Sequence, residues 1–260
     1  FPAIRAAIDM ALFDLLAKSE GKSVVEHLGQ VHQCLPTSIT IGVESFDKTI
    51  EDAKRNIEKG FSILKIKIGE NIDEDIEKIF ALSELGAEDL LIRVDANRGY
   101  NVKELEQFFE KTQHLGLELI EQPLPKDQIK EMLNFPEELR NICVADESLH
   151  SPDDAYQLTK GMKPFGVFNI KLMKCGGIYP ALEIARIAEN EGIELMWGCM
   201  DESKISITAA LHAALASPAT KFLDLDGFFD LGWDLMSGGY ICEHGVMQTN
   251  HKPGLGLYHE

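Results

Sequence analysis

The sequence predicts an α/β barrel in which short parallel strands alternate with helices. Eight segments rich in Ile, Leu and Val recur at intervals of roughly 25–28 residues, about the length of a strand, a crossover helix and two loops. Helix-like patterns lie between them, and 260 residues are enough for one large domain of this kind. A doubly wound open sheet is the alternative, but no Gly-x-Gly-x-x-Gly follows the first predicted strand.

The predicted strands are apolar and are bounded by Gly, Pro, Asn or Asp. In chain order they are Thr37–Val43, Ile63–Gly69, Leu90–Asn97, Leu117–Pro123, Ile142–Ser148, Val167–Met173, Glu194–Met200 and Phe222–Gly227. Between them, helical periodicity covers Asp47–Lys59, Asp73–Glu84, Val102–His114, Pro152–Gly161, Pro180–Glu191 and Ser203–Leu215. Ser151 before Pro152 is a favourable helix start, because Ser caps helices and Pro fits the first helical position.

The chain divides into three parts around this barrel. Residues 1–32 form an N-terminal helical segment, which begins with an alanine-rich amphipathic helix over Pro2–Leu16. We expect residues 33–230 to form the barrel, and the Gly-rich, irregular residues 231–260 to form a C-terminal tail. The first residue is Phe1 rather than a methionine, so we expect the natural beginning of the protein to lie upstream.

Charge and cysteine content exclude several classes of partner. The net charge of −18 and the pI of about 4.8 argue against nucleic acid and against an anionic membrane. The five cysteines are odd in number and include no Cys-x-x-Cys pair, which favours a reduced, cytoplasmic setting. No apolar run reaches membrane-spanning length, and no stretch resembles a signal peptide. We expect a homo-oligomer that acts on a small molecule.

Near the C-terminal ends of most predicted strands, polar side chains fall on one and the same face of the strand. In an extended strand Lys65 and Lys67 share one face, opposite Leu64, Ile66 and Ile68. On a surface strand these lysines would be solvated, but in a barrel covered by helices they are enclosed, and enclosed lysines are paired or functional. The same alternation places polar groups at the C-terminal ends of other strands, where such barrels have their active sites. These residues are Thr40, Asp95, Glu121, Asp146, Lys171, Asp224 and Asp226.

A single acidic residue at a strand end has a simpler explanation. Such a residue usually caps the next helix or stabilises a turn. This is our first interpretation for Glu147, Asp201 and Glu202. The recurrence at six strands is what favours a functional interpretation for the set.

The residue types at these strand ends indicate a reaction class. Asp95, Glu121 and Asp146 come from consecutive strands, and three neighbouring carboxylates repel one another unless a cation lies between them. Oxygen-only ligation predicts Mg²⁺, with Mn²⁺ as the alternative. Lys67 and Lys171 would lie on opposite sides of an eight-stranded ring, with a substrate between them. This arrangement suits proton removal next to a carboxylate, an enediolate stabilised by the metal and reprotonation by the opposite lysine, which is racemisation or epimerisation.

These residues resemble the enolase superfamily, within its muconate lactonizing enzyme subgroup. The matching motifs are Lys65-Ile66-Lys67, Val94-Asp95-Ala96-Asn97, Ile120-Glu121-Gln122-Pro123, Ala145-Asp146-Glu147-Ser148 and Asn169 to Gly177, and the likeness extends to Gly254-Leu255-Gly256. The resemblance implies a (β/α)₇β barrel, because the last strand leads into the tail instead of a helix. It also implies an N-terminal α+β capping domain that closes the site, which this chain largely lacks, with the tail packing back on the capping region.

Within the subgroup, Leu223 to Gly227 resembles the Asp-x-Asp pair of dipeptide epimerases, whose carboxylates hold the free ammonium of the substrate. The resemblance implies epimerisation of a dipeptide such as L-Ala-L/D-Glu, released from cell-wall peptide, at its C-terminal residue. It assigns Lys67 and Lys171 as the acid/base pair, Asp95, Glu121 and Asp146 as the Mg²⁺ ligands, and Lys65, Thr40, Asp224 and Asp226 as substrate-binding residues. Without the capping domain, hydrophobic and cationic dipeptides are alternative substrates.

Other activities share part of this pattern. An N-acylamino acid racemase or an o-succinylbenzoate synthase has the same lysines and metal ligands, but its substrate offers no free ammonium to Asp224 and Asp226. A Schiff-base aldolase would use one barrel lysine and would not require the carboxylates. A catalytically inactive scaffold or binding protein would lack at least one lysine or ligand, and none is missing.

Overall fold

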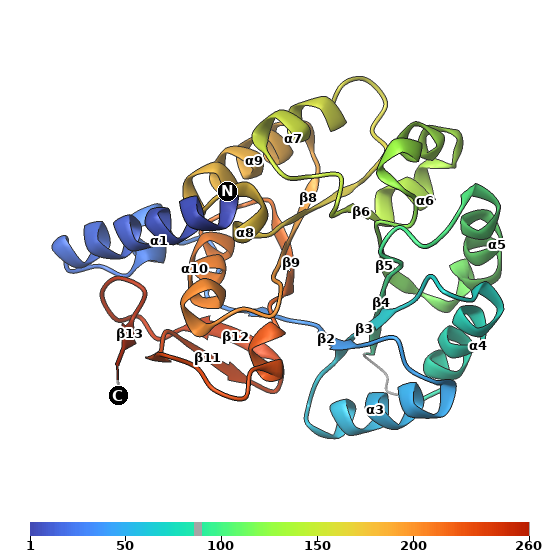
Figure 1. Cartoon of the computed structure of the whole chain (residues 1–260), viewed down its shortest axis with the longest axis horizontal. Helices are drawn as coiled ribbons and strands as arrows, with labels where there is room; N and C mark the ends of the chain where they lie inside the picture. The colour runs from blue at the N-terminus through green and yellow to red at the C-terminus, as the bar shows by residue number, and fades with distance from the viewer. Residues whose placement is uncertain (86–89, 260) are drawn as a thin grey trace. The chain divides into compact units, whose positions relative to one another are not determined.

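The computed structural model describes residues 1–85 and 90–259, which Figure 1 colours from the N-terminus to the C-terminus. The chain forms two compact units. Unit 1 contains residues 1–37, residues 149–157 and the chain from residue 168 onward. Unit 2 contains residues 38–148 and 158–167.

The main sheet of the described residues has eight strands that follow one another in chain order, which is the strand order of the predicted barrel. They are β2 (Ile39–Ile41), β3 (Ile63–Lys67), β4 (Leu91–Asp95), β5 (Leu117–Glu121), β6 (Cys143–Ala145), β7 (Val167–Ile170), β8 (Glu194–Gly198) and β9 (Thr220–Asp224). All eight predicted strands are therefore confirmed. The predictions extend two or three residues too far at each C-terminal end, because the chain leaves the sheet there, after β7 into the short helix α8 (Leu172–Cys175) and elsewhere into loops.

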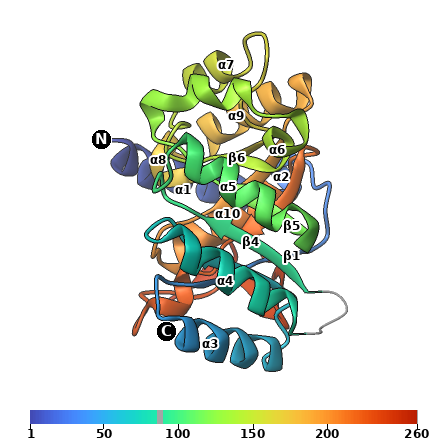
Figure 2. The same ribbon diagram turned by 90° about the vertical axis from the view of Figure 1, so that its right-hand side faces the viewer.

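Unit 2 alternates strands with helices that cover one face of them. The helices are α3 (Phe46–Glu58), α4 (Ile72–Ser83) and α5 (Val102–Thr112), and the three lie side by side in Figure 2. Asn71 and Asn101 cap the last two, because each side chain accepts backbone N–H bonds from the first turn. A 3₁₀ segment, η1 (Gln113–Leu115), precedes β5. Between β5 and β6 the chain forms a second 3₁₀ segment, η2 (Lys126–Asn134), and a short helix, α6 (Glu137–Ile142).

The core of unit 2 sets the direction of its polar residues. Ile66 of β3 is the register partner of Val94, and Val94 is the register partner of Ile120. All three side chains are fully buried. Since alternate residues of a strand point to opposite faces, the residues on either side of this apolar row point to the other face of the sheet.

Unit 1 combines the N-terminal helices, the last strands and the tail. Its helices are α1 (Pro2–Ser19), α2 (Val24–Leu28), α7 (Pro152–Leu158), α8 (Leu172–Cys175), α9 (Ile178–Glu191) and α10 (Lys204–Leu215). The predicted helix start at Ser151 is confirmed, since its hydroxyl accepts the Asp154 N–H at 3.2 Å. Thr37 forms a parallel bridge with Leu223 of β9, and its hydroxyl accepts the Leu225 N–H at 2.9 Å.

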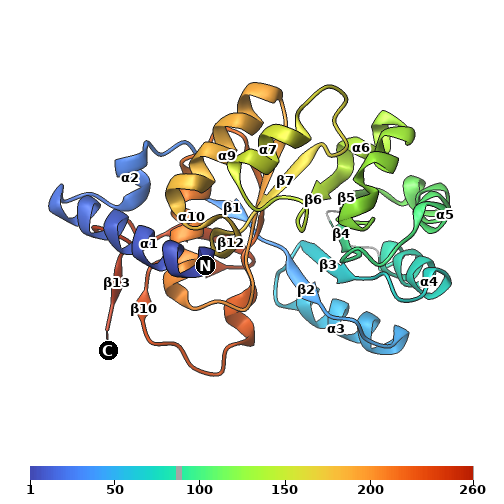
Figure 3. The same cartoon turned by 45° about the horizontal axis from the view of Figure 1, so that its top comes forward.

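The tail is more regular than its composition predicts (Figure 3). After η3 (Gly227–Asp230) it forms β10 (Ser237–Gly238), β11 (Tyr240–Glu243), β12 (Val246–Thr249) and β13 (Leu257–Tyr258), while its last residue, 260, lies outside the described residues. The strand β1 (Leu35–Pro36) pairs with β12, and β10 pairs with β13. Asp14 of α1 accepts the Leu255 N–H at 2.7 Å, which ties the tail to the N-terminal helix.

The predicted N-terminal helix is confirmed, but most of its large apolar side chains are exposed, whereas an amphipathic helix would bury them. Ala6, Met10 and Ala17 are the side chains that α1 buries. The larger side chains of Ile4, Ile8, Leu12 and Leu15 are 59–66% exposed. Across the described residues, no helix is both long enough and apolar enough to cross a membrane.

His212 gives unit 1 a pH-dependent stability. It is fully buried in α10, and its Nδ1 accepts the Val25 N–H at 2.9 Å. Burial lowers the pKa of His212 from 6.5 to about 4, although Asp14 and Glu26 act weakly in the opposite direction. Because the folded-state pKa lies below the unfolded-state value, the unfolded chain takes up the proton first as the pH falls from 6.5 toward 4. We expect the free energy of unfolding to fall by up to about 3 kcal/mol across that window.

Urea unfolding at pH 7 and at pH 5 measures this effect. We expect His212→Gln to remove most of the difference between the two pH values, whatever its effect on stability at pH 7. The matched control is His114→Gln, at an exposed position, which should keep the wild-type difference. An unchanged pH dependence in His212→Gln would contradict the assignment.

Candidate active site

The strand register of unit 2 places the predicted lysines and carboxylates in one row. Lys67 of β3 is the register partner of Asp95, the last residue of β4. Asp95 is in turn the register partner of Glu121, the last residue of β5. Asp146 follows β6 by one residue and lies two positions after Val144, the register partner of Glu121. These side chains therefore belong to the same face of the sheet.

The two lysines are paired with the carboxylates. Lys65 Nζ lies 2.6 Å from Glu121 Oε2 and 3.2 Å from Asp95 Oδ2, and the Lys65 side chain is only 4% exposed. Lys67 Nζ lies 2.7 Å from Asp95 Oδ2 and donates to Asn97 Oδ1 at 2.9 Å. Burial alone would raise the pKa of Asp95, but the ammonium groups of Lys65 and Lys67 outweigh it and lower that pKa. Asp95 is therefore a carboxylate at neutral pH.

The carboxylate set fits a hard divalent cation by its chemistry. Within residues 1–85 and 90–259, no three His, Cys, Asp or Glu side chains converge as a ready metal cluster, and the ammonium groups of Lys65 and Lys67 lie against Asp95 and Glu121 instead. Asp95, Glu121 and Asp146 offer carboxylate oxygens, which are the donors that Mg²⁺ prefers.

The loops that follow β4 and β5 carry residues for which the sequence analysis proposes no role. Asn97, Arg98 and Gln122 all have positive φ angles, of 43°, 69° and 35°. Such angles are uncommon for residues other than glycine and concentrate at functional sites. The nearest signal in the sequence is that Asn97 and Gln122 lie within motifs that carry a predicted metal ligand, and that Arg98 directly follows one of them.

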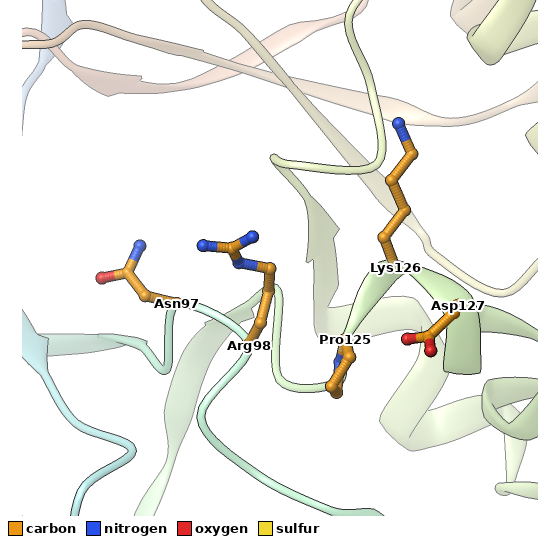
Figure 4. Close-up of a pocket in the computed structure, with 5 residues that line it drawn as sticks. All are labelled: Asn97, Arg98, Pro125, Lys126 and Asp127. Atoms are coloured by element: carbon orange, nitrogen blue, oxygen red, sulfur yellow. The ribbon is translucent and has the colours of Figure 1, made fainter.

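A pocket of about 620 Å³ lies over these loops, lined by Asn97, Arg98, Pro125, Lys126 and Asp127 (Figure 4). In Figure 4 the side chains of Lys126 and Asp127 point in different directions. Arg98 Nε pairs with Glu147 Oε1 at 3.1 Å. Glu147, for which we first expected a cap or turn role, therefore joins the loop after β6 to the loop after β4.

The remaining predicted residues of unit 2 and those of unit 1 also lie at strand ends. Thr40 of β2 is half-buried and is the register partner of Lys65. In unit 1, Lys171 follows β7 directly and precedes the first residue of α8. Asp224 is the last residue of β9 and Asp226 lies two positions later, and the two are 3% and 9% exposed.

Two further residues of unit 1 lie near Asp224 and Lys171. Cys199 Sγ lies 3.4 Å from the Asp224 carbonyl oxygen. Burial, together with Asp226 and Asp224, raises the pKa of Cys199 well above its usual value, so this thiol is protonated and unreactive at neutral pH. Glu202 accepts bonds from the Met200 N–H and the Ser206 hydroxyl. It therefore stabilises the turn before α10, in agreement with the turn role expected for it, whereas the N-cap residue of α10 is Ser203.

The fold and these strand-end residues define a class of protein. Residues 48–258 match the family described as enolase C-terminal domain-like. This match covers most of the chain, so the chain belongs to that family. The predicted family and the predicted α/β barrel fold are confirmed.

Particular relatives are dipeptide epimerases. An L-Lys-D/L-Arg epimerase from Desulforapulum autotrophicum is 53% identical over 256 residues, covering 98% of this chain and 72% of the relative. The structure of a dipeptide epimerase from Methylococcus capsulatus, complexed with Mg and L-Arg-D-Lys, has a TM-score of 0.96 and 49% identity over 98% of this chain and 72% of its own. The L-Ala-D/L-Glu epimerase structure from Bacillus subtilis has a TM-score of 0.91 and 34% identity over 97% of this chain and 71% of its own.

Proposed function

We propose that this chain catalyses the epimerisation of dipeptides at the α-carbon of their C-terminal residue. The observation that carries the proposal is the enclosed cluster of Lys65, Lys67, Asp95 and Glu121, in which two lysines lie against the carboxylates that end β4 and β5. Asp95 and Asn97 fix the position of Lys67 Nζ, and a positioned amine in its neutral form can remove a proton from a carbon next to a carboxylate. The similarity to dipeptide epimerases supports the dipeptide as the class of substrate.

Asp95, Glu121 and Asp146 are the proposed ligands of Mg²⁺, with Mn²⁺ as the alternative. A magnesium ion in the Methylococcus capsulatus structure supports this assignment. Bound there, the ion supplies positive charge that stabilises negative charge developing on the substrate carboxylate. Lys65 pairs with Asp95 and Glu121 and is proposed to donate a hydrogen bond to the substrate carboxylate as well.

Lys67 and Lys171 are the proposed acid/base pair. For one epimer, neutral Lys67 takes the α-proton at Nζ while the Lys171 ammonium delivers a proton to the other face of the same carbon, and the roles reverse for the other epimer. The substrate therefore loses one proton and gains one in each turnover. Asn97 Oδ1, 2.9 Å from Lys67 Nζ, limits the positions that this amine can take.

Asp224 and Asp226 are the proposed binding groups for the free ammonium of the dipeptide, since a buried ammonium needs charged acceptors. Thr40, in register with Lys65, is proposed to line the same face.

Dipeptides whose side chains carry positive charge are the proposed preferred substrates. The higher identity to the L-Lys-D/L-Arg epimerase than to the L-Ala-D/L-Glu epimerase supports this preference, and a net charge of −18 attracts cationic substrates at long range.

Proton NMR in deuterium oxide with Mg²⁺ tests the function and the preference together. L-Lys-L-Arg, L-Ala-L-Glu and N-succinyl-L-Arg are incubated separately with the protein. We expect the Arg α-proton signal of L-Lys-L-Arg to disappear as L-Lys-D-Arg accumulates, faster than the matching change in L-Ala-L-Glu. Turnover of N-succinyl-L-Arg alone would replace the proposal with the N-acylamino acid racemase alternative, because that substrate has no ammonium for Asp224 and Asp226.

The setting of the enzyme is part of the proposal. The proposed division is a helical segment (1–32), a barrel (33–230) and a tail (231–260). The tail is proposed to pack on a capping region, and the enzyme is proposed to be a homo-oligomer. A cytoplasmic location is supported by the cysteines, all five of which lie in described residues as free thiols.

A further inference from the structure

Gln122 occupies a conformation that its residue type rarely adopts. It directly follows Glu121 at the end of β5, is fully buried and has a φ angle of 35°. A left-handed conformation is strained for a residue other than glycine and persists only where the surroundings enforce it. The contacts of Gln122 show what enforces it.

The backbone of Gln122 joins the chain segments on both sides of β5. Its N–H donates to the Val144 carbonyl of β6 at 2.9 Å. Its carbonyl accepts the Arg98 N–H from the loop after β4 at 2.7 Å. Gln122 therefore extends the hydrogen bonding of the sheet one residue beyond the end of β5, while its φ angle turns the side chain toward the loop after β6.

The side-chain amide uses both of its ends. Oε1 accepts the N–H groups of Asp146 and Ser148, at 3.0 Å and 3.1 Å. Nε2 donates to the Leu124 carbonyl at 3.0 Å. All three bonds are buried, and only an amide of this length supplies an acceptor for two N–H groups and a donor for a carbonyl together.

The three proposed metal ligands differ in what holds their backbones. Asp95 and Glu121 are the last residues of β4 and β5 and are in register with each other. Asp146 lies one residue beyond the end of β6, which ends at Ala145, and the Gln122 side chain accepts its N–H. The amide of Gln122 thus takes the place of a strand partner for Asp146.

We propose that Gln122 is the positioning residue that places the Asp146 carboxylate beside those of Asp95 and Glu121 for cation binding. This inference rests on the proposed function, because it assigns Asp146 to the metal site. Gln122 does not touch the ion; it fixes the backbone from which one ligand projects. Groups that orient a metal ligand in this way typically change metal affinity by 10–100-fold when they are removed.

The test measures Mg²⁺ binding directly, by isothermal titration calorimetry of the wild-type chain and of Gln122→Met. Methionine keeps the length of the side chain and removes all three hydrogen bonds. We expect the Mg²⁺ Kd to rise at least about 10-fold. The Mg²⁺ concentration that gives half the maximal epimerisation rate should rise by the same factor, with much of kcat recovered at saturating Mg²⁺.

Thr112→Val is the matched control, because the Thr112 hydroxyl makes a buried bond to the Phe108 carbonyl at 2.7 Å within α5 of the same unit. This variant should lose stability in urea without a change in Mg²⁺ affinity. Gln122→Glu keeps an acceptor for Asp146 and Ser148 but loses the donor to Leu124, so it should show an intermediate Mg²⁺ Kd. It also provides the measurement if Gln122→Met does not fold.

The outcomes separate this inference from the proposed function. A Gln122 variant that is folded and less stable, but binds Mg²⁺ within twofold of the wild type, would overturn the positioning role. So would a wild-type chain that binds no Mg²⁺ at millimolar concentrations. Weakened Mg²⁺ binding in a protein that epimerises no dipeptide would uphold the role of Gln122 and overturn the proposed function alone.

Discussion

Lys67→Ala and Lys171→Ala are each expected to lower the rate of dipeptide epimerisation by at least about 10³-fold. Each variant lacks one of the two proposed proton-transfer groups, and a positioned general acid or base typically contributes 10²–10⁴-fold. Epimerisation requires both groups in the same turnover, so loss of either should stop net inversion. Chiral chromatography of the dipeptide product, with Mg²⁺ present, measures this loss.

The two variants should differ in the proton exchange that they retain. Removing and returning a proton on the same face needs only one base. Lys67→Ala should therefore still exchange the α-proton of one epimer with deuterium oxide, and Lys171→Ala should exchange that of the other. Proton NMR of the separate L,L and L,D dipeptides measures both rates.

Lys78→Met is the control for loss of a buried lysine as such. Lys78 pairs with Glu74 at 2.9 Å and donates to the Glu44 carbonyl, and it is not one of the proposed site residues. It should lose stability but keep epimerisation and both exchange reactions. Exchange of both epimers by Lys67→Ala, or loss of both in each variant, would contradict the assignment of one lysine to each face.

The sequence could predict the site residues that lie within strands, because side chains alternate between the two faces of a strand and the face of each residue follows from its position. Lys67, Asp95 and Glu121 fall into adjacent register positions because each lies in the same phase of a parallel strand. Their types then indicate metal and proton chemistry without knowledge of any distance. The family and the barrel followed from the same residues, since motif order along the chain is preserved.

The sequence could not predict what happens where each strand ends. Asn97, Arg98 and Gln122 leave the sheet with positive φ angles, which are uncommon for Arg and Gln and which an Asn in the sequence permits but does not require. The expected strands therefore ran into the loops, and Asp146 was expected inside a strand although it lies beyond β6. The bonds that hold it come from Gln122, 24 positions away in the chain, and such tertiary contacts leave no local pattern.

Loss of the Lys65 ammonium should destabilise the fold and strengthen the response to magnesium. Lys65→Met leaves Glu121 and Asp95 enclosed without the ammonium that now lies 2.6 Å and 3.2 Å from them. Removing one partner of a buried ion pair typically costs about 3–5 kcal/mol, because the remaining charge keeps its desolvation penalty. Urea unfolding in the absence of divalent cations measures the change in the free energy of unfolding.

The double variant Lys65→Met, Glu121→Gln separates the pairing from the loss of packing. It should recover part of the stability lost in Lys65→Met, since neither charge is then left without its partner. An equal or larger loss in the double variant would show that Lys65 acts through packing rather than through its charge.

Magnesium should stabilise the wild type and the two variants to different extents. In Lys65→Met the carboxylates of Asp95, Glu121 and Asp146 repel one another with less compensation, so a divalent cation relieves more repulsion than it does in the wild type. A ligand that binds only the folded state stabilises it in proportion to the logarithm of its concentration over Kd. Mg²⁺ should therefore raise the Tm of Lys65→Met more than that of the wild type, and it should raise the Tm of the double variant least, because Glu121→Gln removes a ligand. If Mg²⁺ leaves the Tm of Lys65→Met unchanged, these carboxylates do not hold the cation, and the charge that Lys65 balances serves the fold alone.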